Sequence, residues 1–255
     1  MNKILNLQKY FLYLVGPFSI IFLWFILTEF KLISPIFLPK PIEVVVSFYN
    51  TVLDFTLITD IGFTLYRVSF GFLIATIVGV PIGLLMGYYK KVSNSLEFLV
   101  EFFRAIPATA LFPLFLLIFG IGDDAKIGIS AWAAGLVIVL NSMYGVHLGK
   151  ENRIKAAKVM KISEWDLFKR VIFPEALPQI FAGLRIGLSF SLIVVIVTEM
   201  FIGTNFGLGH RIIDTQLAYR IDEMYMTILV TGIIGFSLNK ILQRIENKII
   251  HWKGK

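Results

Sequence analysis

Long apolar runs are the feature that most limits what this chain can fold into. Several of them stay nearly free of charge over about 20 residues, the length that an α-helix needs to cross the hydrocarbon core of a bilayer. Lipid offers the backbone no hydrogen-bond partners, so such runs cross as helices whose N–H and C=O groups pair within the helix. We expect an all-α, polytopic transmembrane helix bundle with six spans, at residues 11–30, 61–88, 95–120, 126–146, 180–201 and 226–242.

Composition supports a membrane protein built as one domain over residues 1–255. Hydrophobic residues make up 57% of the chain and charged residues 16%, against about 25% charged in soluble domains, and the mean hydropathy is +0.79. The run at 11–30 is longer than the apolar core of a signal peptide, about 7–15 residues, so we take it as a span. The chain has no cysteine, which excludes disulfides and thiol catalysis.

The distribution of lysine and arginine predicts the orientation in the membrane. With both termini inside, most basic residues fall in the N-terminus, a short turn at Lys90 and Lys91, the stretch 151–178 and the C-terminal tail. The outside segments hold only Lys31, Lys40, Lys126, Arg211 and Arg220. Short cytoplasmic loops are enriched in basic residues, so we expect a multi-pass protein of the cell membrane with cytoplasmic N- and C-termini. The same bias accounts for the net charge of +7 without nucleic-acid binding.

Small residues recur every four positions in the second and fifth expected spans. They are Gly71, Ala75, Gly79, Gly83 and Gly87 in the second span and Gly183 and Gly187 in the fifth. Small residues at this spacing line one helix face and allow close helix packing, which a gating element could use. Pro81 lies inside the first stripe and predicts a kink. The alternative is that glycine is simply common in membrane helices.

Charged residues inside the expected spans are the candidates for contact with a solute. Arg104 lies three residues after Glu101, a spacing that allows an ion pair either at the inner interface or facing a pathway. Glu199, near the outer end of the fifth span, either lines a pathway or reaches water at the interface. Pro107 and Pro113 predict that the third span is bent or broken. We take Arg104 and Glu199 as possible pathway residues.

Two outside segments separate the spans. Residues 31–60 lead through a proline-rich stretch into an amphipathic patch, residues 42–57, which we place along the membrane interface. Residues 203–225 are polar. Their candidates for contact with an external partner are Arg211, Asp214, Arg220, Asp222 and Glu223.

The stretch 151–178 is a long charged interruption that predicts two short helices on the membrane surface. In the first helix, apolar residues such as Val159 and Met160 alternate with lysines at helical spacing. Helix-to-helix connections usually take about 2–8 residues, so a stretch of this size is expected to be a docking surface. In the second helix, Ser163 is the expected N-cap with Asp166 three residues on, as in a capping box. Pro174 and Pro178 are expected to stop that helix and redirect the chain.

At this stretch the chain resembles the permease subunits of ATP-binding-cassette (ABC) importers. Their cytoplasmic loop carries Glu-Ala-Ala, three residues, Gly, nine residues and Ile-x-Leu-Pro. The same register falls on Lys155-Ala156-Ala157, Lys161, Val171 and Phe173-Pro174. Lys155 replaces the family's Glu and Lys161 its Gly, so neither a salt bridge from the acidic position nor a turn that needs glycine carries over.

Further matches extend the resemblance over nearly the whole chain and look most like the sulfonate, taurine and nitrate branch. They are Leu38-Pro39-Lys40-Pro41, Arg104-Ala105-Ile106-Pro107, Phe119-Gly120-Ile121-Gly122, Thr198-Glu199-Met200 and Gly207-Leu208-Gly209. The resemblance implies a type I ABC importer permease that carries a small organic or inorganic anion.

The resemblance also implies partners. These are a cytosolic ABC ATPase, an extracytoplasmic substrate-binding protein and a second permease copy, all assembled at the lipid bilayer. The implied ATPase-coupling residues are Lys155, Ala156, Ala157, Lys161, Ser163, Asp166 and Pro174. The chain lacks a GxxxxGK[ST] phosphate loop, so we expect no cofactor on it, no enzymatic activity of its own, and ATP and Mg²⁺ in the partner ATPase.

Two other classes remain as alternatives. A secondary transporter or channel would need ion-coupling groups in mid-span and often internal repeats. A membrane enzyme would need a catalytic cluster, whereas His147, His210 and His251 are far apart in sequence and show no metal-binding spacing. Co-purification with a soluble ATPase would separate the importer from both.

Overall fold

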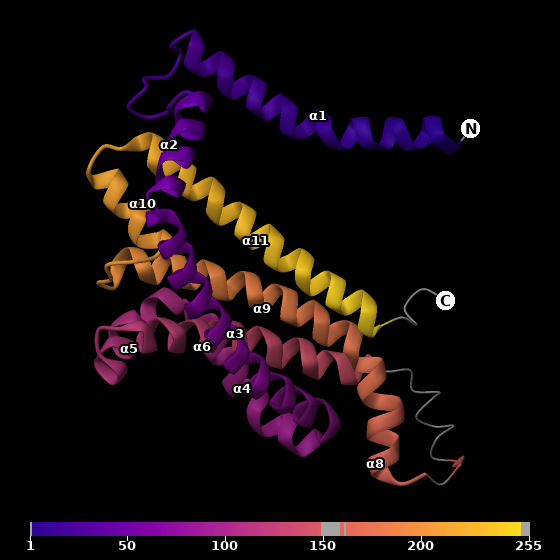
Figure 1. Ribbon diagram of the computed structural model, residues 1–255. Helices are drawn as coiled ribbons and strands as arrows, with labels where there is room; N and C mark the ends of the chain where they lie inside the picture. Colours follow the sequence, from indigo (N-terminus) through magenta and orange to yellow (C-terminus); the bar gives the residue numbers. More distant parts are fainter. Residues whose placement is uncertain (1, 149–158, 161, 251–255) are drawn as a thin grey trace.

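The computed structural model describes residues 2–148, 159, 160 and 162–250, and these form helices and short connections with no strand (Figure 1). The helices are α1 (Asn2–Glu29), α2 (Pro41–Leu53), α3 (Thr56–Tyr88), α4 (Lys90–Ala105), α5 (Phe112–Phe119), α6 (Asp123–His147), α8 (Glu164–Leu167), α9 (Phe173–Phe201), α10 (Leu208–Leu217) and α11 (Ile221–Ile249). A 3₁₀ turn, Ala108–Leu111, precedes α5, and a π-helical turn, Phe168–Ile172, joins α8 to α9.

Helices α3, α6 and α9 form the centre of the molecule, with α6 packed along both of the others. Ala75 of α3, Ile138 of α6 and Val195 of α9 belong to one core cluster and are at most 2% exposed. The ends of these helices that we expect to face outside are covered by α10, which packs against α9 and α11, and α2 packs against α11. Figure 1 shows α1 standing apart from this centre.

The described residues contain four helices long and apolar enough to cross a membrane. They are Thr56–Tyr88, Asp123–His147, the continuous run Glu164–Phe201 and Ile221–Ile249. The pair α4 and α5 passes the same test together but is bent by 91°, so the expected break at Pro107 is present and gives up to five spans. The expected span at 11–30 falls on α1, whose described apolar part, Val15–Glu29, is shorter than these.

Several expected boundaries differ from the structure. Tyr89 alone forms the turn after α3, so Lys90 and Lys91 are already helical in α4. The patch expected at 42–57 is α2 followed by a tight turn, because Phe55 has a left-handed backbone (φ 57°) and ends the run before α3. The polar segment 203–225 contains α10, and the last span extends to Ile249 rather than to 242.

The expectation that Pro174 and Pro178 end a helix is wrong. The chain is helical without interruption from Glu164 to Phe201, with Pro174 in the first turn of α9 and Pro178 inside it. A proline within a helix removes one N–H and crowds the carbonyl four residues earlier. The π-helical turn Phe168–Ile172 includes Arg170, the residue four positions before Pro174, and the wider hydrogen-bond spacing of such a turn relieves both constraints at Pro174.

Candidate functional site

A buried ion pair joins these same ends of the central helices, which we call the outer ends after the expected orientation. Arg67, inside the apolar helix α3, is 2% exposed, and its Nη1 donates to Glu199 of α9 at 2.6 Å. Its Nε donates to Asp123, at the start of α6, at 2.8 Å. Glu199 is 1% exposed and also accepts a hydrogen bond from the Thr64 hydroxyl at 2.9 Å. With its oxygens taken by groups of this chain, Glu199 offers none to a solute in this conformation.

A second cation completes what we call the outer charge cluster, defined as Arg67, Asp123, Lys126 and Glu199. Lys126 is 1% exposed, and its charge interacts with those of Arg67, Asp123 and Glu199. The ion pairs of Arg67 with Glu199 and Asp123 limit the cost of burying its guanidinium group in a low-dielectric site. The Nζ of Lys126 donates to the Gly122 carbonyl at 3.0 Å. Sequence analysis missed Arg67, although an arginine in the middle of an apolar helix is itself a signal of function.

The segment between α9 and α10, together with the first turn of α10, is fastened to the spans by side chains. Three successive backbone N–H groups are taken up: Gly207 by Asp60 at 2.8 Å, Leu208 by Thr64 at 2.9 Å and Gly209 by Glu199 at 2.9 Å. Gly207 has φ +130°, and a Cβ there would lie 2.5 Å from Cδ of Glu199. Both the backbone conformation and the close approach require glycine.

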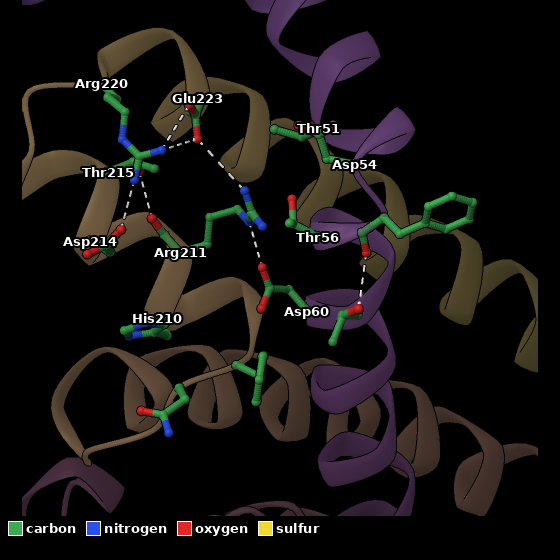
Figure 2. Close-up of a pocket in the computed structure, with 14 residues that line it drawn as sticks. Thr51, Asp54, Thr56, Asp60, His210, Arg211, Asp214, Thr215, Arg220 and Glu223 are labelled. Carbon is green, nitrogen blue, oxygen red and sulfur yellow. Dashed lines mark hydrogen bonds and ion pairs between the residues drawn. The ribbon is translucent and has the colours of Figure 1, made fainter.

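Figure 2 shows a polar cavity of about 490 Å³ directly beside this segment, between the start of α3, α10 and the start of α11. Arg211 lies 2.6 Å from Asp60 and 3.8 Å from Glu223, while Arg220 lies 2.9 Å from Asp214 and 3.0 Å from Glu223. Of the predicted external contacts, all but Asp222 line this cavity; Asp222 lines a smaller one.

The charges of this outer cavity are almost all engaged with one another. Its lining includes the carboxylates Asp54, Asp60, Asp214 and Glu223 and the guanidinium groups Arg211 and Arg220. Both guanidinium groups are paired, so the cavity presents no free arginine to an anion. Across the described ranges, no three His, Asp or Glu side chains gather as metal ligands.

The broken span places Arg104 at the end of α4, two residues before the bend. Its Nη2 donates to Glu101 at 2.6 Å, and both side chains are about half exposed, at 54% and 41%. The bend lies between Ala105 and Ala108, where the backbone leaves the helical hydrogen-bond pattern. Arg104 is therefore the accessible arginine at the break, and Arg67 is the enclosed one.

Both small-residue stripes face α6. A Cβ at Gly71 would lie 2.6 Å from Oγ of Ser130, and one at Gly87 would lie 2.6 Å from Cβ of Val146. A Cβ at Gly187 would meet Cγ1 of Ile138 at 2.9 Å. The remaining stripe contacts follow the same pattern: Gly79 meets Gly135 and Ile138, Gly83 meets Val139 and Ser142, and Gly183 meets Asn141. Glycine at these positions lets α3 and α9 approach α6 closely.

Of the expected coupling residues, Lys155, Ala156, Ala157 and Lys161 lie outside the described residues. Ser163 caps α8, because its Oγ accepts the N–H of Asp166 at 3.1 Å. Apolar side chains close to this cap are exposed, at 83% for Val159, 75% for Met160 and 69% for Trp165. Such a group at a polar helix end is typical of a surface that another protein covers.

The sequence from residue 79 to residue 251 matches the family model of the binding-protein-dependent transport system inner membrane component. The chain belongs to this family. A relative named a probable ABC transporter permease protein, from Brucella abortus (strain 2308), is 32% identical over 91% of each chain. The taurine transport system permease protein TauC of Escherichia coli (strain K12) is 29% identical over 94% of this chain and 90% of its own.

Solved structures of this kind share the fold. A chain of the MetNI methionine ABC transporter in an inward-facing conformation superposes with a TM-score of 0.67 at 20% identity, over 77% of this chain and 97% of that chain. The expected type I importer permease fold is therefore confirmed. The protein is a membrane permease of the binding-protein-dependent ABC importer class.

Proposed function

We propose that this permease forms the pathway for a small organic or inorganic anion of the sulfonate, taurine or nitrate type, driven by a separate cytosolic ATPase dimer. The observation that carries the ATPase coupling is the unbroken helix from Glu164 to Phe201, which is 38 residues and about 57 Å long. Its cytoplasmic end stands beside the exposed Val159, Met160 and Trp165, and its other end holds Glu199. The run is continuous but turns between α8 and α9 (Figure 1), so a movement of the coupling surface reaches Glu199 along one helical chain.

The proposal assigns three partners. The ATPase binds the stretch 151–178, with Lys155 to Ala157, Lys161, Ser163 and Asp166 as contacts, and it holds the ATP and Mg²⁺, so that this chain needs no cofactor. An extracytoplasmic substrate-binding protein docks over the outer cavity. A second copy of the permease completes the pathway. Both termini lie in the cytoplasm, which the excess of basic residues in the expected inside segments supports.

The anion contact falls on Arg104. The TauC relative is named for taurine, whose sulfonate group carries a full negative charge, and a guanidinium group is the side chain best suited to such an oxyanion. Arg104 is exposed at the break of a span, where irregular backbone is tolerated in membranes when it lines a pathway. Its bond to Glu101 is one that an arriving anion could replace.

The test is extraction of the tagged permease from its native membrane in mild detergent and identification of the proteins that accompany it. The coupling variant is Ala157→Glu, and the matched control is Ala218→Glu, the same change at an exposed residue at the opposite, outer end of the molecule. We expect an ABC ATPase with the wild type and with Ala218→Glu, and none with Ala157→Glu.

Two results would contradict the proposal. If the ATPase remains bound to Ala157→Glu and uptake is normal, the stretch 151–178 is not the coupling surface. If the permease is recovered alone and moves solute without ATP, it works as a secondary transporter or channel.

A further inference from the structure

The outer charge cluster has a property that the importer function leaves unexplained. Arg67 uses all three of its nitrogen atoms within the chain: Nε and Nη1 reach Asp123 and Glu199, Nη1 also donates to the Phe206 carbonyl at 2.8 Å, and Nη2 donates to the Thr204 hydroxyl at 3.1 Å. Two of these acceptors are on spans and two are on the segment after α9. One side chain thus fixes that segment to the spans.

The residues that hold this segment lie on one face of α3. Asp60, Thr64 and Arg67 stand at positions i, i+4 and i+7 of α3 and therefore on one face of the helix. Asp60 bonds the Gly207 N–H through Oδ1 and the Arg211 side chain through Oδ2 at 2.6 Å. The face that carries Arg67 therefore also determines where Arg211 lies.

This placement creates the outer cavity. Asp60, Phe206, His210 and Arg211 line it, and each belongs to α3 or to the fastened segment and the α10 that follows. Thr215 of α10 also lines the cavity and is 1% exposed, so α10 is tightly seated. Arg67 is not a lining residue, and its side chain is 2% exposed. Its effect on the cavity must pass through the segment it holds.

We propose that Arg67 is a positioning residue for the extracytoplasmic partner: it holds residues 204–211 and α10 against α3, and so builds the outer face on which that partner docks. The inference rests on the proposed importer function only for the identity of the partner as a substrate-binding protein. The positioning itself is a property of this chain.

A thiol reporter tests the positioning directly, because the chain has no cysteine of its own. Thr215→Cys places a buried thiol on α10, and Asn205→Cys places an exposed one nearby. Each is combined with Arg67→Lys, which keeps the charge but cannot reach four acceptors. Labelling by a membrane-impermeant maleimide is measured on the ATPase-bound permease in membranes.

We expect labelling of the Thr215→Cys thiol to become about tenfold faster with Arg67→Lys, since fewer hydrogen bonds then hold α10 closed. Labelling at Asn205→Cys should stay unchanged. The matched control is Lys40→Gln, which removes another outer cation, one paired with Glu29 at 2.9 Å and exposed. It should leave both rates as in the wild type. Equal Thr215→Cys rates with and without Arg67→Lys would overturn the proposal.

Thr64→Val is the second variant, and it decides the outcome if Arg67→Lys fails to assemble. It keeps the side-chain volume and removes the hydroxyl that donates to Glu199 and accepts from Leu208. Faster labelling of the Thr215→Cys thiol is again expected, and an unchanged rate contradicts the proposal.

Docking is read separately, from ATP hydrolysis stimulated by the binding protein that co-purifies with the complex. Arg67→Lys should raise the binding-protein concentration for half-maximal stimulation by about tenfold with the maximal rate preserved. A lower maximal rate at an unchanged half-maximal concentration would mean that Arg67 acts in the helix movement instead. If no binding protein stimulates the wild type, the importer function fails while the labelling result still stands.

Discussion

Replacing Gly83 with alanine tests whether the small-residue stripe of α3 is needed for packing. A Cβ at this position would overlap the Val139 carbonyl of α6 and lie 2.6 Å from Cβ of Ser142. The backbone of Val139 cannot move aside as a flexible side chain can, so the overpacking should cost about 3 kcal/mol of stability. Alanine offsets about 1 kcal/mol of this because it is the better helix former. The net loss is about 2 kcal/mol.

Gly62→Ala is the matched control on the same helix. A Cβ at Gly62 would meet no atom within 4 Å, so only the helical preference of alanine remains, worth about 0.5–1 kcal/mol of added stability. At about 2–4 °C per kcal/mol for a chain of this size, Gly83→Ala should lower the apparent Tm by about 4–8 °C and Gly62→Ala should raise it by about 1–4 °C.

The assay is thermal unfolding of the purified permease in one detergent at a fixed heating rate, followed by the loss of soluble folded protein. Opposite signs for the two alanine variants are the expected result. A Gly83→Ala protein as stable as the wild type, or shifted in the same direction as Gly62→Ala, would show that the contact with Val139 does not limit the approach of α3 to α6.

Four further substitutions have expected outcomes. Ser142→Ala should leave the Tm unchanged or raise it, because the buried Ser142 hydroxyl has no hydrogen-bond partner. Ser130→Ala should lower the free energy of unfolding by about 1 kcal/mol, because it removes the 2.6 Å hydrogen bond between the Ser130 and Ser191 hydroxyls. Ser163→Ala should destabilise the start of α8 by about 1 kcal/mol, seen as faster hydrogen exchange of the amides after the cap. Arg104→Gln should lower anion uptake at least about tenfold, corresponding to one lost charge-assisted bond, without loss of ATPase binding; normal uptake would remove Arg104 from the pathway.

The parts of the fold that follow a local period could be predicted from the sequence. The run of Gly71 to Gly87 every four residues determines which face of α3 can approach a neighbour, and that face does meet α6. The N-cap at Ser163 and the break at Pro107 are equally local, since each depends on residues within one turn. The sequence could not show that the stripe of the fifth span, Gly183 and Gly187, packs against the same helix, α6.

The outer charge cluster could not be predicted, because its contacts join distant parts of the chain. Arg67 and Glu199 are 132 positions apart, and Gly207 is bound by a carboxylate 147 positions earlier. Glu199 alone gave two open interpretations, and only its partners exclude a free carboxylate facing the pathway. The prediction that Pro174 and Pro178 end a helix was wrong for a related reason. The π-helical turn that accommodates Pro174 has no simple sequence signal.

The geometry of α9 links the two ends of the protein quantitatively. The middle of the helical run Glu164–Phe201 falls near Gly183, where α9 lies against Asn141 of α6 with no side chain between the backbone and its neighbour. The 16 residues of α9 from Gly183 to Glu199 form an arm of about 24 Å, so a tilt of about 5° about Gly183 moves Glu199 by about 2 Å. The hydrogen bonds of Glu199 to Arg67 and Gly209 are 2.6 and 2.9 Å long, and bonds of this kind do not survive such a displacement. A small tilt of α9 about the contact at Gly183 is therefore enough to break the bonds that hold the segment before α10.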